Sequence, residues 1–180
     1  MSGVPITIPS LPSMAPDAAD LIPAWDTSLG LTGRISIAAL NTLLTSVGGD
    51  WTPELRFGGA APVGITGSLV GAYSRIGSLV TITGQIALTS KGAQVGNAAI
   101  YGLPYAVASG PKYNGALALH VGGNFAYTGT MSVSITNGSL VMAMTVVNNG
   151  VGAFLTNTHF SNTSVLFFTG SYITSSPLIL

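Results

Sequence analysis

Apolar and polar residues alternate on both sides of Gly77-Ser78, which is the pattern of two neighbouring strands joined by a tight turn. A Gly-X pair suits the two-residue turns that hairpins prefer, so the sequence predicts that Ile76 faces Leu79 and that the pairing continues outward from there. One face of this hairpin then holds Tyr73, Val80, Ile82, Ile86 and Leu88, and the other holds Ser74, Thr81, Thr83 and Gln85. Such a division is expected of a sheet with one buried face.

The same alternation predicts strands along most of the chain after residue 68. The expected ranges are 69–76, 79–89, 97–101, 115–121, 124–136, 139–147, 151–156 and 163–174. Asn-Gly, the strongest short hairpin signal, starts at positions 114, 137 and 149. A two-residue turn at the middle pair predicts that Ile135 faces Leu140, that Val133 faces Met142 and that Met131 faces Met144, all on one face.

The last expected strand, Ser164–Ile173, is apolar on both faces, so we expect it inside a sheet that is covered on both sides. Many short strands, regular turn signals and no helix among them predict an all-β domain. The expected architecture is an antiparallel β-sandwich of jelly-roll-like type.

The beginning of the chain has a different pattern. Prolines at positions 5, 9, 12 and 16 keep it extended. We then expect an extended segment from Leu21 to Trp25, a turn near Gly30, and a helix with Ser36 as its N-cap that ends near Gly48-Gly49. The run from Trp51 to Gly59 leads into the β-rich part. The sequence therefore divides into an extended and helical segment, residues 1–50, and a β-domain, residues 51–180.

Charged side chains are scarce and unevenly placed. Asp, Glu, Lys and Arg make up 6% of the chain, whereas soluble domains average about 25%. All five acidic residues precede residue 55, and only Arg75, Lys91 and Lys112 carry charge from Phe57 onward. This composition fits a membrane protein, an aggregating fibre or a protein whose surface is consumed by assembly. Because no stretch has the roughly 18 consecutive apolar residues of a membrane helix, we expect no membrane insertion and favour assembly.

The β-rich part lacks the groups that most catalytic mechanisms need. After Glu54 there is no Asp, Glu or Cys, which excludes paired carboxylates and thiol nucleophiles there, so we expect no enzymatic activity. His120 and His159 are the only histidines, and no thiolate accompanies them, so we expect neither a metal nor a cofactor. Three basic side chains are too few for a nucleic-acid surface.

Three short runs follow one another in a distinctive order. They are Tyr-Ser-Arg-Ile-Gly-Ser-Leu-Val-Thr-Ile (73–82), Thr-Ser-Lys-Gly (89–92) and Gly-Leu-Pro-Tyr (102–105). This order resembles that of bacteriophage tail-fibre and virion surface-fibre proteins, in which it occurs in a C-terminal β-domain. The ending Phe168–Ile173 is similar to the last strand of many such fibres. The resemblance implies a phage particle component and favours a homotrimer.

The pattern Asp-Leu-Ile-Pro-x-Trp-Asp (20–26), followed by Arg-Ile-Ser (34–36) and leucines, is similar to virion-attachment segments of phage fibres. The resemblance implies that attachment to other virion proteins involves Leu21, Ile22, Trp25, Arg34, Ile37, Leu40, Leu43 and Leu44. The apolar side chains of the expected helix share one face, which a module of about 30 residues cannot bury alone. The alternative is that this face packs on the β-domain of its own chain.

Aromatic and amide side chains gather in two long connections between expected strands, where binding residues commonly lie. The receptor-binding candidates are Tyr101, Tyr105, Tyr113, Asn114, Asn148, Asn149, Phe154, Asn157, His159, Phe160 and Asn162. Sugars stack on aromatic rings and bond to amides, so the expected partner is a glycan or protein of the host cell surface. The alternative is that the tyrosines fill the core or a subunit interface while the asparagines satisfy turns.

We therefore hypothesise a non-enzymatic structural protein of a phage virion, located on the particle surface or the tail. It would be a short trimeric fibre that attaches by its N-terminal segment and contacts the host through its β-domain. The alternative function is a free bacterial carbohydrate-binding or adhesin-like β-sandwich module. An attachment partner separates the two hypotheses, because a lectin needs none.

Overall fold

The computed structural model describes residues 21–26, 31–37 and 46–176. The chain divides into two units, Met1–Thr45 and Ser46–Leu180, and we call the second unit the β-domain. Strand β3 (Val47–Trp51) belongs to the β-domain, whose sheet therefore begins before the expected residue 51. Within the described residues, no helix has the length and apolar character required to cross a membrane.

The described part of the first unit is a β-hairpin. Strand β1 (Leu21–Asp26) pairs antiparallel with β2 (Leu31–Ser36), from Leu21 opposite Ser36 to Asp26 opposite Leu31. The expected extended segment thus corresponds to β1, and Arg34 lies in β2. Of the expected helix, only Ile37 is described and is helical, while Leu40, Leu43 and Leu44 lie outside the described residues.

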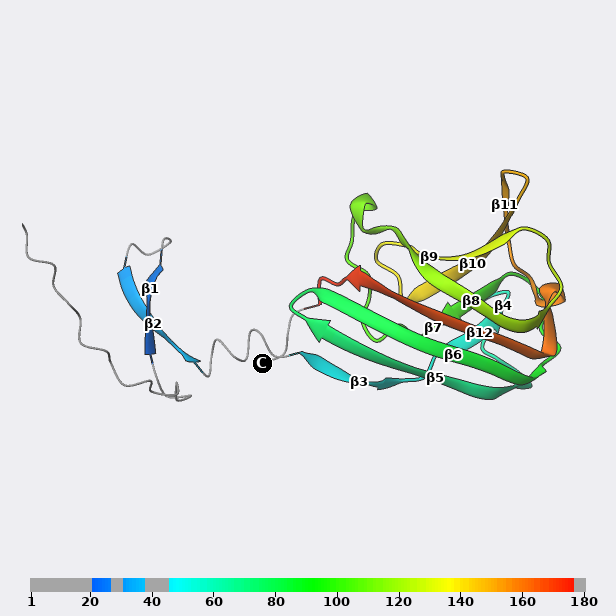
Figure 1. The fold of residues 1–180 in the computed structure, drawn as a ribbon, viewed down its shortest axis with the longest axis horizontal. Helices are drawn as coiled ribbons and strands as arrows, with labels where there is room; N and C mark the ends of the chain where they lie inside the picture. Colours follow the sequence, from blue (N-terminus) through cyan, green and yellow to red (C-terminus); the bar gives the residue numbers. More distant parts are fainter. Residues whose placement is uncertain (1–20, 27–30, 38–45, 177–180) are drawn as a thin grey trace, which may run out of the picture. The chain divides into compact units, whose positions relative to one another are not determined.

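Ten strands of the β-domain form one antiparallel sheet in the order β3-β5-β6-β12-β8-β9-β10-β7-β4, with β11 beside β10 (Figure 1). The further bounds are β4 (Glu54–Phe57), β5 (Ile65–Ile76), β6 (Leu79–Lys91), β7 (Ala98–Tyr101), β8 (Gly115–Phe125), β9 (Thr130–Ile135), β10 (Val141–Asn148), β11 (Val151–Phe154) and β12 (Phe160–Ile173). The prediction of an all-β antiparallel fold is confirmed.

The sheet folds into two layers that share β8. Residues 115–117 of β8 pair with β9, whereas residues from Ala118 onward pair with β12. The first sheet is therefore β3-β5-β6-β12-β8, and the second is β8-β9-β10-β7-β4 with β11. The expected strand over 124–136 is wrong, because β8 continues through Gly122-Gly123 to Phe125 and β9 begins only at Thr130.

The two edge strands, β3 and β4, are neighbours in the sequence, separated by Thr52 and Pro53. The chain passes from one edge of the sheet to the other in two residues, so the sheet curls until its edges approach each other. Trp51 of β3 and Leu55 of β4 both enter the hydrophobic core. Neither strand was predicted from the sequence, where Trp51–Gly59 was interpreted only as the entry to the domain.

The hairpin at Gly77-Ser78 has the predicted register. Ile76 lies opposite Leu79, Arg75 opposite Val80 and Tyr73 opposite Ile82. Gly77 has a φ of 57°, which a two-residue turn with glycine in first place requires. The alternation of residues and the turn chemistry favour the same register here, so the sequence alone was sufficient to predict it.

The hairpin around Asn137-Gly138 is shifted by two residues from the prediction. Ile135 lies opposite Met142 and Val133 opposite Met144, so the predicted pairs are wrong. The connection is longer than two residues because other segments hold it: the Gly138 amide donates to the Val107 carbonyl at 3.0 Å, and the Asn137 amide donates to Asn114 Oδ1 at 2.8 Å. A shift of two keeps every side chain on its predicted face.

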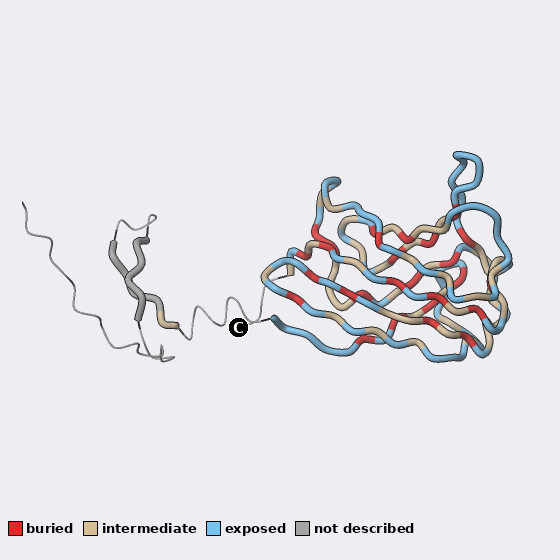
Figure 2. The backbone as a smooth tube through the Cα atoms, viewed as in Figure 1, coloured by how far each residue is buried: buried red, intermediate tan, exposed pale blue. Residues whose placement is uncertain are grey.

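The final strand, β12, lies inside the first sheet between β6 and β8, as predicted. Its inward side chains Leu166, Phe168 and Tyr172 are buried in the core between the layers. Buried and exposed positions alternate along the strands (Figure 2). The outward Phe167 keeps 40% of its surface exposed, so the single chain covers only one of the two apolar faces of β12.

Gly84 of β6 lies opposite Phe168, and a β-carbon at this position would overlap the Phe168 ring. We predict that Gly84→Ala lowers the free energy of unfolding by about 1–3 kcal/mol, because the core must rearrange around the added methyl group. Gly152→Ala in β11 is the matched control, since nothing lies within 4 Å of its β-carbon position. Denaturant unfolding of both variants checks this, and equal stabilities would contradict it.

Candidate interaction surfaces

The β-domain has two ends, which we name after their short 3-10 helices. At the η1 end, η1 (Pro111–Tyr113) lies with the Gly77-Ser78 turn and the loop 136–140, and the Thr174 amide donates to the Ser78 carbonyl at 2.9 Å. At the η2 end, η2 (Asn157–His159) lies with the end of β6, where Lys91 Nζ donates to the carbonyls of Asn157 and Phe160 at 2.9 Å. The β10–β11 hairpin belongs to the η2 end (Figure 1).

The two sequence clusters of receptor-binding candidates lie at these opposite ends. Tyr105, Tyr113 and Asn114 lie toward the η1 end, where the Leu103 amide donates to the Leu140 carbonyl at 3.2 Å, whereas the Tyr101 hydroxyl lies close to Gly59 and so points away from that end. The other seven candidates, from Asn148 to Asn162, lie toward the η2 end. A compact ligand at the η1 end therefore cannot reach the seven candidates at the η2 end of the same chain.

Tyr105 belongs to a cluster around the buried Arg75, which is 3% exposed. Arg75 Nε donates to the Gly77 carbonyl at 2.8 Å, and Arg75 Nη2 donates to the Ser176 carbonyl. The guanidinium lies 4.5 Å from the centre of the Tyr105 ring, a cation–π geometry. Tyr172 donates its hydroxyl to the Tyr105 carbonyl at 2.9 Å. These contacts hold the segment around Tyr105 to β5 and β12, so Tyr105 has a structural role in the fold.

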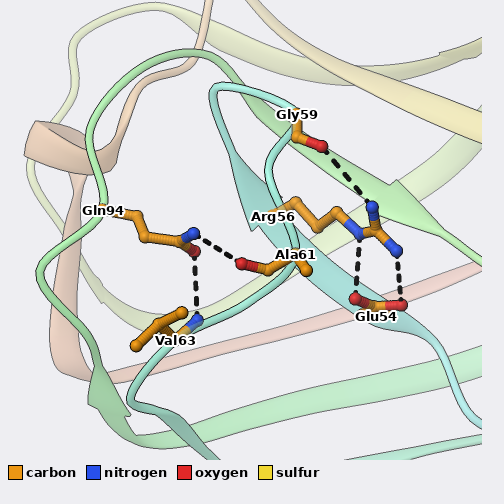
Figure 3. Close-up of polar contacts among 6 residues, drawn as sticks. All are labelled: Glu54, Arg56, Gly59, Ala61, Val63 and Gln94. Carbon is orange, nitrogen blue, oxygen red and sulfur yellow. Dashed lines mark hydrogen bonds and ion pairs between the residues drawn. The ribbon is translucent and has the colours of Figure 1, made fainter.

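Tyr101 and Asn114 also have partners within the chain. Arg56 lies 4.3 Å above the Tyr101 ring and forms a two-point ion pair with Glu54, at 2.8 and 3.0 Å (Figure 3). In the same view, Gln94 donates to the Ala61 carbonyl at 2.6 Å and so holds the loop before β5. Asn114 Oδ1 accepts the Asn137 amide, and Tyr113 packs against the core. Receptor binding by these residues stays a prediction.

At the η2 end the candidates differ in exposure. Asn148 and Asn149 are exposed, and Phe154 keeps 52% of its surface exposed. Phe160, in contrast, is 3% exposed and packs edge-on against Phe57 and Phe125, with ring centres 5.1 and 4.8 Å away.

The side chains of two further candidates at this end accept hydrogen bonds from backbone amides. Asn157 Oδ1 accepts the Gly96 amide at 3.1 Å, and Asn162 Oδ1 accepts the Lys91 amide at 3.0 Å. Their side chains therefore hold loops in place with at least one of their polar atoms.

A surface hollow of about 350 Å³ lies at the η2 end, where β8 and β12 lose their regular register. Its lining is Asn124, Phe125, Ala126, His159, Phe160, Ser161 and Thr163. His159 Nδ1 accepts the Thr156 amide at 2.9 Å, so the neutral ring carries its proton on Nε2. Asn124 has a φ of 63°, an uncommon conformation for a residue with a side chain. The hollow thus combines ring, amide and hydroxyl groups.

Sequence reasoning found His159 and Phe160 but missed Asn124, Ser161 and Thr163. The sequence signal that could have indicated this irregularity is Gly122-Gly123-Asn124, because a pair of glycines before an asparagine is typical of a bulge or turn. The alternation of residues instead predicted a new strand from residue 124.

The outward-facing side chains of the first sheet form a second surface, which we call the outer face. It comprises Gly48 and Asp50 of β3; Ser68, Val70, Ala72, Ser74 and Ile76 of β5; Leu79, Thr81, Thr83, Gln85 and Ala87 of β6; Val165, Phe167, Thr169, Ser171 and Ile173 of β12; and Ala118 and His120 of β8. Asp50, on the edge strand, is its single charged residue. The outer face is therefore almost uncharged.

Small residues give the outer face a shallow relief. Three hollows border Thr83, and the Phe167 ring bounds two of them. His120 stacks on Phe167, with ring centres 6.0 Å apart and planes inclined by 30°. Val70 is 52% exposed beside them. This relief combines projecting rings with gaps above small side chains.

Among the residues that the structure describes, no three His, Cys, Asp or Glu side chains are grouped closely enough to hold a metal ion. Asp50 and Glu54 are the carboxylates of the described β-domain, and Glu54 is paired with Arg56.

No protein-family model matches the chain, and no curated protein matches it. Among solved structures, the crystal structure of the Dettilon tailspike protein is similar, with a TM-score of 0.56 and 14% sequence identity. The match covers 71% of this chain and 24% of that chain, so the chain spans about a quarter of the tailspike's length. At this identity the similarity concerns the fold.

Burial raises the pKa of Tyr172 in the Arg75 cluster to about 12. Because an unfolded tyrosine ionises near pH 10, the unfolded chain loses this proton first, and we predict that stability falls as pH rises from about 10 to about 12. Tyr172→Phe lacks this ionisable hydroxyl and its two hydrogen bonds. At neutral pH its free energy of unfolding should therefore be lower than that of the wild type by about 0.5–1.5 kcal/mol per lost bond. This difference should shrink as the pH rises over that range. Unfolding of both proteins at several pH values checks this, and a constant difference would refute it.

Proposed function

We propose that this chain is a structural, receptor-binding component of a bacteriophage tail. In this proposal three copies form a short fibre, the first unit attaches it to other virion proteins, and the β-domain contacts a glycan or protein on the host surface. The observation that carries the proposal is the fold similarity to part of a tailspike protein. The runs that resemble phage fibres also support it, and the first of them contains Arg75, which contacts the Gly77 carbonyl and the Tyr105 ring.

Assembly is supported by the distribution of charge. Arg56 pairs with Glu54, Arg75 bonds to carbonyl groups, and Lys91 bonds to two more. Few charged groups are left to interact freely with water, and a soluble monomer normally presents a charged surface. Burying the outer face between subunits removes the surface that water solvates least.

The direction of the chain supports host contact at the η2 end. Val47, the first residue of β3, lies opposite Arg75 at the η1 end. The chain therefore enters the β-domain at the η1 end, which is opposite the η2 end. That end carries the exposed β10–β11 hairpin and the hollow around His159.

We further propose that the protein acts by binding and not by catalysis. The support is chemical: of the carboxylates in the described β-domain, Glu54 is engaged by Arg56, and Asp50 is the single charged residue of the outer face, on an edge strand. General acid and base chemistry would need a second group beside one of them.

The second candidate function is a free carbohydrate-binding module. The hollow favours it, since stacking rings and amide and hydroxyl groups suit a neutral sugar and need no virion. The N-terminal segment discriminates between the candidates, because only the virion protein needs a docking partner for it.

We predict that His159→Asn and Asn124→Gly each weaken adsorption of the phage, or of the purified protein, to host cells about tenfold, since one good hydrogen bond contributes about that factor. Asparagine at 159 can still accept the Thr156 amide, and glycine at 124 tolerates the observed φ of 63°. Ser78→Ala, exposed at the η1 end, is the control and should adsorb normally. Normal adsorption of both hollow variants, with unchanged melting, would place host contact elsewhere.

We also predict that a chain starting at Ser46 folds, because the strands of the larger sheet and the residues of the described core all lie after residue 45. It should nevertheless fail to enter phage particles, because it lacks the proposed attachment segment. Circular dichroism measures folding, and immunoblotting of purified particles measures incorporation against the full chain. A truncated chain that unfolds would show that the first unit stabilises the β-domain. A folded truncated chain that is incorporated normally would remove the attachment role.

A further inference from the structure

We propose that copies of this chain meet through the outer face of the first sheet, which places Thr83, Phe167 and His120 of each copy in the subunit interface. The inference rests on the homotrimer of the proposed function and assigns the surface that forms it. The partner is thus a second copy of the same chain, and the second sheet stays in contact with solvent.

Three hydroxyl groups at the centre of the outer face are already hydrogen-bonded within the chain. Thr81 Oγ1 and Ser171 Oγ are hydrogen-bonded at 2.8 Å, and the Thr169 hydroxyl donates to the Ile82 carbonyl at 3.1 Å. Burying a hydroxyl is costly mainly when it loses its partner, so these three hydroxyl groups can leave water at little cost. Thr83 and Gln85 have no hydrogen-bond partner within the described residues and remain available to the neighbouring copy.

The charges of the two sheets distinguish their outward surfaces. On the second sheet, Glu54 and Arg56 face outward beside Tyr101 and form the ion pair of Figure 3. Burying such a pair costs the hydration of both ions. The outer face of the first sheet has Asp50 alone, on its edge strand, so a partner that covers β5, β6 and β12 meets no charge.

Charge complementarity identifies the partner as another copy. An uncharged face of Ala, Ser, Thr and apolar residues complements a surface of the same kind, and each copy supplies one. The relief agrees with this, because Phe167 projects, at 40% exposure, beside hollows above Thr83 and Ala72 that small side chains leave open. Around a threefold axis the contact is head to tail, so one part of the outer face, such as the Phe167 ring, meets a different part of the neighbour's outer face, such as the hollows beside Thr83, and the ring closes.

Single cysteines test the assignment in the full chain, which has no cysteine of its own. Thr83→Cys reports on the outer face, and Thr130→Cys is its matched control: an exposed strand threonine that faces outward from the second sheet. We expect maleimide to label Thr83→Cys about tenfold more slowly than Thr130→Cys when each rate is normalised to the denatured protein, because a buried thiol reacts slowly. Light scattering of both variants should give three times the 18.1 kDa chain mass.

A second pair of variants adds a charge at the same positions. Thr83→Lys should dissociate the assembly to monomers, whereas Thr130→Lys should leave it trimeric. A trimer in which both cysteines react equally fast overturns the interface assignment and leaves the proposed trimer intact. A wild-type monomer overturns the trimer itself. If Thr83→Lys does not fold, the labelling rates still decide the assignment.

Discussion

The pairing of β12 with β6 is the interaction on which the rest of the β-domain depends. It joins residues 165–173 to residues 79–87 in one continuous antiparallel ladder. Inward, it brings Phe168 against Trp51, with ring centres 5.9 Å apart, and so connects the centre of the first sheet to its edge strand β3. Outward, the same strands present Thr83, Phe167 and Thr169. One ladder thus builds both the core and the outer face.

Three of the few charged side chains of the β-domain, Arg56, Arg75 and Lys91, have a structural role. Arg75 ties the end of β5 to Tyr105 and Ser176, Lys91 ties the end of β6 to η2, and Arg56 covers Tyr101. These groups act at the ends of the domain and on the second sheet. The outer face of the first sheet carries none of these three side chains, and its single charged residue, Asp50, lies on the edge strand β3.

The amount of the site that the sequence could predict depended on whether its geometry was local. At Gly77-Ser78 the turn and its flanking strands decide the register between them, and the prediction is confirmed. At Asn137-Gly138 the amides bond instead to Val107 and Asn114, which are distant in the sequence, and the predicted pairs are wrong by two residues. The hollow around Asn124 was missed for the same reason, since a bulge between β8 and β12 creates it.

By itself the sequence determined the all-β class, the face on which most strand side chains lie, and the near absence of charge after Glu54, because these follow from alternation and composition. Only the tertiary structure decided which strands are neighbours, since pairings such as β6 with β12 join residues about 90 positions apart. It also separated the tyrosine and asparagine clusters to opposite ends and left one face of β12 uncovered. The residues of a strand determine which of its faces is apolar, whereas the packing of the whole chain decides what covers that face.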